Sequence, residues 1–373
     1  MKYKFGDIIY NITEKKKPTE DDRLNYIGLE HLDSGSLFVT RWGAERTPEG
    51  EKIVMKKGDV LFGKRRAYQK KVAISPIDGV FSAHGMVLRP KENVISKEFL
   101  PFFISSDYFL NEAIRISVGG LSPTINWKDI KELEFNLPSI DEQKVLAEKL
   151  WAAYEVKQSY LKMIDATDKM VNAQFIEMFG SSAERVALSS LCDTFIDGDW
   201  IEAKDQSNAG IRLIQTGNVG VGTFKDKGDK ARYISEETFN RLNCTEVVEG
   251  DILISRLPEP VGRACIIPAG LGKSITAVDC TIIRLNDKVL PKFFVAFTST
   301  PDYAMQIKKV LSGTTRLRVS RANLGKIQVP LPSVDKQQQF VTIAEQADKS
   351  ISELRKSVDA IDKVIKSLIN EKL

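Results

Sequence analysis

The sequence has few of the residues from which metal centres, disulfides and acid–base catalysts are built. Its four cysteines all lie in the second half of the 373 residues, and no two are closer than 15 positions. That spacing excludes a CxxC-type zinc site and argues against a disulfide framework, so we expect free thiols packed as small hydrophobic side chains. The only histidines, His31 and His84, have no cysteine or histidine nearby. We therefore expect two structural histidines and no metal site.

Sequence motifs for binding nucleotides and cofactors are missing as well. Segment 267–274 ends like a phosphate-binding P-loop, but Ile267 stands where that pattern needs glycine, and Pro268 follows it. The glycines of segment 217–222 do not have the spacing of a dinucleotide-binding loop. The Pro-Pro pair of adenine methyltransferases occurs nowhere in the chain. These absences predict a non-catalytic polypeptide with no cofactor of its own.

Long apolar runs and a strong net charge are also absent. No run approaches the length of a membrane span, and the first residues lack the apolar core of a signal peptide, so we expect a cytoplasmic protein with no membrane partner. The net charge is only +4. Basic residues are instead concentrated in residues 56–71, where seven accompany one acid, and in residues 308–326, where six accompany none. Such local patches fit a protein that contacts phosphates along one face.

What the chain does contain is an internal repeat. The sequence LPSIDEQK at 137–144 returns 194 residues later as LPSVDKQQ at 331–338. Upstream, Gly58-Asp59 is matched by Gly250-Asp251, each before a short apolar run. Both halves have the turn signals and short apolar runs of a small α+β domain. We expect two similar domains, residues 1–138 and 183–332, each followed by a long helix, residues 139–182 and 333–373.

The two helical segments are predicted to pair with each other. From Phe340 to Leu368 apolar residues recur in alternating steps of four and three, which is a heptad seam. The earlier segment has a similar pattern, interrupted by Lys157, Thr167 and Gln174. The seam residues are expected to be Leu146, Leu150, Tyr160, Ile164, Val171, Phe340, Ile351, Leu354, Val358, Ile361 and Ile365.

A spacing role for these helices is one of two interpretations. At about 1.5 Å per residue, a helix of roughly 36 residues is about 54 Å long. That length is comparable to about one and a half turns of B-DNA, at ~34 Å per turn. A self-contained coiled coil with no further role is the alternative. Because each helix follows a repeated domain, holding two domains at a set distance is the more economical interpretation.

Polar loops of the two halves are candidates for DNA contact. Arginine can bridge guanine, glutamine can bridge adenine, and lysine mostly contacts phosphate. A solvated basic loop is the alternative for each of them. The candidate residues are Lys64, Arg65, Arg66, Tyr68, Gln69, Lys70, Lys71, Arg256, Arg263, Thr315, Arg316 and Arg318. Because equivalent loops hold different side chains, the two halves would recognise different base sequences.

Over essentially its whole length, the chain resembles the specificity (S) subunit of type I restriction–modification systems. The resemblance rests on the Gly58-Asp59 element and, above all, on two Leu-Pro-Ser elements that each close a domain and open a heptad helix. It implies two tandem target recognition domains, separated by two antiparallel coiled-coil helices and related by a pseudo-twofold repeat. Each domain would read one half of a split, asymmetric site in double-stranded DNA.

The resemblance also implies partners. The helices would dock two methyltransferase (M) subunits, which methylate adenine with S-adenosylmethionine. Restriction (R) subunits, where added, would cut unmodified DNA with ATP, so S-adenosylmethionine, ATP and Mg would be bound by partners. Two alternatives remain open: an enzyme with its own methyltransferase or nuclease chemistry, and a coiled-coil scaffold without DNA recognition.

Overall fold

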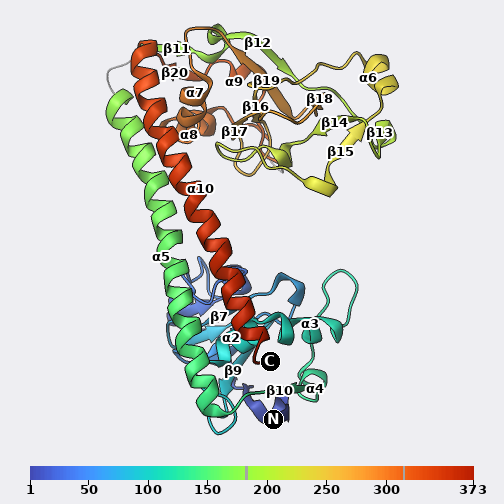
Figure 1. The fold of residues 1–373 in the computed structure, drawn as a ribbon, viewed down its shortest axis with the longest axis vertical. Helices are drawn as coiled ribbons and strands as arrows, with labels where there is room; N and C mark the ends of the chain where they lie inside the picture. The colour runs from blue at the N-terminus through green and yellow to red at the C-terminus, as the bar shows by residue number, and fades with distance from the viewer. Residues whose placement is uncertain (181–183, 314–315) are drawn as a thin grey trace. The chain divides into compact units, whose positions relative to one another are not determined.

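The computed structural model describes residues 1–180, 184–313 and 316–373, and these form two compact units (Figure 1). The first unit comprises Met1–Lys162 together with Leu354–Leu373, and the second comprises Met163–Glu353. Each unit therefore contains one of the repeated domains and a part of both long helices.

The domain of the first unit is built on two four-stranded sheets and one strand pair. One sheet is antiparallel and has the order β2 (Ile9–Ile12), β9 (Met86–Pro90), β6 (Val60–Phe62), β7 (Val72–Ile74). The other has the order β3 (Lys15–Lys16), β5 (Lys52–Met55), β8 (Gly79–Phe81), β4 (Tyr26–Ile27). The pair joins β1 (Lys2–Lys4) to β10 (Glu134–Asn136), and the helices are α1 (Phe5–Ile8), α2 (Leu100–Ser105), α3 (Asp107–Arg115) and α4 (Trp127–Ile130).

Phenylalanine dominates the core of this domain. Phe5, Phe103 and Phe135 are buried around Phe109, whose ring centroid lies 4.9–5.5 Å from each of theirs. Ser106 ends α2 and begins α3, since its hydroxyl accepts the Phe109 backbone N–H. This cap turns the chain so that both short helices bury their apolar faces in one cluster.

The second unit repeats this plan. One sheet has the order β12 (Cys192–Asp197), β19 (Cys280–Leu285), β16 (Ile252–Ser255), β17 (Ala264–Ile266). The other has the order β13 (Gln206–Ser207), β15 (Arg232–Ile234), β14 (Ile211–Ile214), β18 (Ser274–Thr276). Its strand pair is β11 (Arg185–Ala187) with β20 (Gln328–Pro330), and its helices are α6 (Glu236–Leu242), α7 (Pro291–Phe297), α8 (Pro301–Val310) and α9 (Arg321–Leu324).

One sheet differs between the copies. The parallel pairs β4–β8 and β14–β18 correspond, but β5 joins β8, whereas β15 joins β14 on the opposite edge. In the second unit a single bridge between Val247 and Ser274 occupies the place of the β5–β8 pairing. The repeated framework therefore carries a different outer strand in each half.

The two long helices are α5 (Ile140–Phe179) and α10 (Val334–Asn370). In the first unit the start of α5 runs antiparallel to the end of α10, and Lys157 Nζ lies 2.6 Å from Asp362 Oδ1. In the second unit the end of α5 meets the start of α10, where the ring centroids of Phe175 and Phe340 are 5.1 Å apart. The predicted α+β class, with two similar domains and two long helices, is confirmed.

The expected seam residues fall into two groups. At the helix ends Leu146, Leu150 and Phe340 are buried in the cores of the domains, so these ends attach the helices to the domains. Ile164 is 8% exposed, whereas the remaining seam positions are half-buried: Tyr160, Val171, Ile351, Leu354, Val358, Ile361 and Ile365.

A buried glutamine follows each Leu-Pro-Ser element and has a structural role. The Gln143 side chain is fully buried, its Oε1 accepts the Ser96 N–H at 2.9 Å, and its Nε2 donates to Val94 O at 2.9 Å and Pro138 O at 3.0 Å. Gln337 makes the same three bonds, to Leu290 N, Lys288 O and Pro332 O, at 2.8–3.0 Å. Each glutamine fixes the start of a long helix to the loop that leads into its domain's central helices.

Candidate nucleic-acid interface

In both units two loops meet beside the antiparallel sheet. The first unit has a basic loop, residues 64–71, after β6 and a first hairpin, residues 118–124, after α3. The second unit has a proline loop, residues 256–263, after β16 and a second hairpin, residues 312–318, after α8. The contact is conserved between copies, since Ile125 N donates to Lys64 O at 3.0 Å and Val319 N donates to Arg256 O at 3.2 Å.

A Gly-Asp element precedes the strand that leads into the basic loop in the first unit and into the proline loop in the second. Asp59 is buried, accepts the Lys56 N–H at 2.7 Å and receives two bonds from Arg89, at 2.6 and 2.9 Å. Asp251 repeats this arrangement with Val248 N and Arg284. The preceding Gly58 and Gly250 have φ of +92° and +85°, a left-handed conformation that favours glycine. The repeated motif is therefore a structural anchor that positions the loops.

Both hairpins are closed by the same backbone pair. Val118 and Thr124 exchange two N–H···O bonds of 3.0 and 2.9 Å, and Ser312 and Arg318 exchange two of 2.9 Å. Gly313 has a φ of +100°, and a Cβ there would lie 2.4 Å from Arg316 O. Backbone bonds therefore close both hairpins, and these bonds do not depend on which side chains lie between the paired residues.

The start of the basic loop presents cations without counter-ions. Arg65 and Arg66 are exposed, and no carboxylate of the described residues forms an ion pair with them or with Lys64. Arg65 Nη1 lies 3.4 Å from His84 Nε2, and Arg66 Nε donates to Ser122 Oγ at 3.1 Å. Burial lowers the pKa of Lys64, and the charge of a neighbouring lysine adds to this effect. These positive groups are gathered without an acid to neutralise them.

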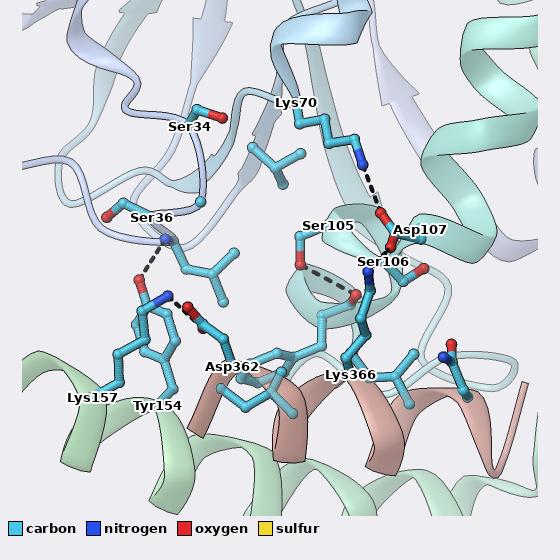
Figure 2. A pocket seen from close by; sticks show the side chains of 17 residues that line it. Ser34, Ser36, Lys70, Ser105, Ser106, Asp107, Tyr154, Lys157, Asp362 and Lys366 are labelled. Atoms are coloured by element: carbon cyan, nitrogen blue, oxygen red, sulfur yellow. Dashed lines mark hydrogen bonds and ion pairs between the residues drawn. The ribbon is translucent and has the colours of Figure 1, made fainter. Parts of the chain in front are cut away.

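The end of the same loop is tied to the protein. Lys70 Nζ lies 2.6 Å from Asp107 Oδ1, and Asp107 Oδ2 lies 2.5 Å from Lys366 Nζ on α10. Lys366 and then Lys70 hold the pKa of the Asp107 carboxyl below its usual value. Figure 2 shows Lys70 pointing toward Asp107, and both residues line a cavity of about 390 Å³ in the first unit. Lys71 donates to Leu29 O at 2.6 Å, so both lysines anchor the loop.

Two more residues of the basic loop lie between these ends. Tyr68 is 53% exposed and Gln69 is half-buried in the short turn Ala67–Gln69. Left-handed residues flank that turn, with φ of 55° at Arg66 and 51° at Lys70. The turn therefore separates the exposed arginines from the anchoring lysines.

The arginines of the proline loop are structural. Arg263 is 8% exposed and donates four bonds, of 2.6–2.8 Å, to the carbonyls of Thr216, Val219, Leu257 and Pro260. Arg256 is 6% exposed and donates to Val278 O at 2.6 Å. Both guanidinium groups therefore shape the loop from inside and are not presented to a ligand.

The second hairpin carries two exposed arginines. Arg316 and Arg318 are exposed and form no ion pair within the described residues, whereas Thr315 lies outside the described residues. Arg321, which follows the hairpin at the start of α9, donates to Phe195 O at 2.7 Å and has Nε 3.6 Å from Asp197 Oδ2. Arg321 and His84 are not among the DNA-contact candidates predicted from the sequence, although Arg321 lies in the acid-free stretch of residues 308–326.

Among the described residues, the exposed arginines without an ion pair therefore lie on different loops in the two units. In the first unit they lie on the loop after β6, and the first hairpin is neutral. In the second unit the corresponding loop is closed around buried arginines, and the hairpin is basic. The two domains share one scaffold but offer different surfaces to a polyanion.

The described residues provide neither a metal site nor a membrane-spanning helix. No group of three or more His, Cys, Asp or Glu side chains is placed to hold a metal ion in residues 1–180, 184–313 and 316–373. No helix of the described part of the chain is long and apolar enough to cross a membrane. All four cysteines are free thiols, and burial raises the pKa of each, to about 12 for Cys192 and Cys265 and about 11 for Cys244 and Cys280.

Residues 1–159 and 182–361 match the family described as the type I restriction modification DNA specificity domain. The chain belongs to this family. The MjaVIII specificity subunit of Methanocaldococcus jannaschii is 20% identical over 98% of this chain and 90% of the relative. The EcoKI specificity subunit of Escherichia coli K12 is 23% identical over 94% of this chain and 82% of the relative.

Solved structures share the fold. A chain from a study of complex assembly and conformational transition in the type I R-M system has a TM-score of 0.55 and 18% identity, covering 100% of this chain and 97% of that one. The type I restriction–modification S subunit of M. genitalium has a TM-score of 0.50 and 14% identity, covering 99% and 94%. The predicted DNA specificity role is confirmed by the family match, and the scaffold without DNA recognition is not supported.

Proposed function

We propose that this specificity-family chain is a non-catalytic subunit that reads a bipartite, asymmetric site in double-stranded DNA, one half-site per domain. The observation that carries the proposal is one exposed pair of arginines without an ion pair in each unit, Arg65 with Arg66 on the basic loop and Arg316 with Arg318 on the second hairpin. Like charges held together without an acid repel one another, and a phosphate backbone relieves that repulsion while releasing counter-ions. DNA is the ligand that this arrangement favours.

The proposed contact residues follow the geometry of the described residues, and Thr315, which lies outside them, is proposed from the sequence alone. In the first domain, residues 1–138, they are Lys64, Arg65, Arg66, Tyr68 and Gln69. In the second domain, residues 183–332, they are Thr315, Arg316, Arg318 and Arg321. Lys70, Lys71 and Arg263 are left out because they donate to protein atoms, and Arg256 is left out because it is only 6% exposed. Since the two sets share no pattern, the half-sites should differ in sequence.

We also propose that the helical segments 139–182 and 333–373 dock two M subunits, with R subunits added for restriction. Val156, Met163 and Met170 recur every seven residues along α5 and are 46%, 51% and 52% exposed. Residues seven apart lie on one face of a helix, and exposed methionines adapt well to a partner's surface. In this proposal S-adenosylmethionine, ATP and Mg are bound by the partners, and adenine methylation takes place there.

The test is methylome sequencing of a host that expresses this chain with its neighbouring methyltransferase. We expect a split motif, with methylated adenine in both halves, that disappears when this chain is deleted. Deletion of the basic-loop arginines should abolish the same motif. An unchanged methylome upon deletion, with both proteins shown to be expressed, would contradict the proposal.

DNA binding should also depend on pH through His84. Burial, and then the charge of Arg65 and neighbouring lysines, hold the pKa of His84 below its ordinary value, so the free protein carries it neutral at pH 7. A nearby phosphate favours the protonated form and raises that pKa in the complex. Affinity should therefore increase as pH falls from 7.5 to 5.5, because binding then favours the protonated form of His84.

Titrations of the M–S complex with DNA at several pH values check this expectation. His84→Gln should remove the added pH dependence. His31→Gln is the matched control, because His31 also has a lowered pKa but is not bonded to the basic-loop arginines. Equal pH slopes for wild type and the His84 variant would show that the histidine lies away from the DNA.

A further inference from the structure

The first hairpin exposes an apolar side chain at its tip. Leu121 is 97% exposed, which is the highest value of any large hydrophobic side chain among the described residues. It therefore contributes no packing to the folded protein. Its neighbours Gly119, Gly120, Ser122 and Pro123 are small or rigid and leave its side chain unobstructed.

The tip is held in place although Leu121 itself touches nothing. The Val118–Thr124 pair closes the hairpin, and Arg66 ties it to the basic loop twice, by its N–H to Pro123 O at 2.7 Å and by Nε to Ser122 Oγ at 3.1 Å. Ile125 N donates to Lys64 O at 3.0 Å, which adds a third tie. The exposed leucine is thus fixed relative to two exposed arginines.

We infer that Leu121 is a specificity-determining residue that contacts the 5-methyl group of a thymine in the half-site of the first domain. The inference rests on the proposed function, in which the arginines bring the duplex to this edge of the domain. In the major groove the methyl group is the one apolar feature that distinguishes thymine from the other bases, and apolar side chains read it. A rigid, unpacked leucine beside phosphate-binding arginines matches that requirement.

Comparison with the second hairpin supports a role for Leu121 in recognition rather than in folding. The second hairpin is closed by the same kind of backbone pair, and its described residues include the exposed Arg316 and Arg318 on either side of Leu317, which is 46% exposed. A leucine that served only to stabilise the folded protein would be expected to pack against other side chains. Each hairpin instead presents a different chemistry from the same support.

The experiment uses the M–S complex and the recognition sequence obtained by methylome sequencing. Each thymine of the first half-site is replaced in turn by deoxyuridine, which removes only the methyl group, and affinities are measured. We expect wild type to lose about fourfold at one position, the equivalent of one buried methyl group. Leu121→Ala should bind the thymine and deoxyuridine forms of that site equally.

Two controls accompany this measurement. Leu24→Ala removes another exposed leucine of the same unit, 63% exposed, and should keep the wild-type preference for thymine. Deoxyuridine in the second half-site should affect wild type and Leu121→Ala alike. Both variants change an exposed side chain, so their melting temperatures should match that of wild type.

Three results would overturn the inference. One is a Leu121→Ala variant that still prefers thymine at every position. Another is an equal loss of affinity for specific and unrelated DNA, which indicates a wedge between base steps instead of a methyl contact. A first half-site without thymine is the third. Failure of the proposed function looks different, since wild type itself would then direct no bipartite methylation.

Discussion

Replacing Arg65 and Arg66 together with alanine is expected to weaken DNA binding by the M–S complex by about 10²- to 10³-fold. Both side chains are exposed and have no carboxylate partner, so their donors are available to phosphate or to guanine. Each such contact is worth about 1–3 kcal/mol, and two contacts account for the expected loss. The slope of log affinity against log salt should fall by about two if both contact phosphate.

The basic loop supplies its own matched control. Lys70→Ala with Lys71→Ala removes the same charge from the same run of sequence, but these lysines bond to Asp107 and to Leu29 O. That double variant should leave the salt slope unchanged and lower stability by about 1 kcal/mol or less, because the Lys70 ion pair is partly exposed. If the lysine variant loses the salt dependence and the arginine variant keeps it, the proposed contact set is wrong.

Gln337→Leu is expected to lower the free energy of unfolding of the second unit by about 3 kcal/mol. The substitution preserves approximate size but removes three hydrogen bonds from a fully buried side chain. The abandoned Leu290 N–H and the two carbonyls then lack partners, and each unsatisfied buried group costs about 1–3 kcal/mol. Because domains are stable by only about 5–15 kcal/mol, this single change removes a large fraction of the total.

Urea denaturation measures the effect. Gln339→Leu is the control, since that glutamine is on the same helix two positions later and is exposed. It undergoes the same chemical change and should shift the midpoint little. Gln143→Leu should produce a comparable loss in the first unit, because its three bonds are equivalent. Equal midpoints for the Gln337 and Gln339 variants would contradict the anchoring role.

The fold was largely predictable because the repeat and the helical periodicity are local patterns. Leu-Pro-Ser elements 194 residues apart and an uninterrupted heptad seam after Phe340 can be read directly from the chain. The attachment of β5 and β15 to opposite edges could not be foreseen. Such a choice depends on long-range pairing of short strands, whose residues carry no mark of their partner.

The interface was harder to predict because charge is visible in a sequence while counter-ions are not. Lys70 and Lys71 looked like DNA contacts, yet their partners lie 37 and 42 residues away in the chain. Arg263 is enclosed by carbonyls as far as 47 residues distant. Among the described candidate residues, Arg65, Arg66, Arg316 and Arg318 stay exposed without an ion pair, and that distinction required the three-dimensional contacts.

The end of α10 has a consequence for the order in which the protein is made. The first unit includes residues 354–373, and Ile369 from that segment is buried with the phenylalanines of the N-terminal core. On the ribosome, the domain translated first must therefore wait for residues translated after the entire second unit. Until then its unfinished apolar face is open to water and to chaperones. The N-terminal half of this chain is the first to be synthesised and the last to be completed.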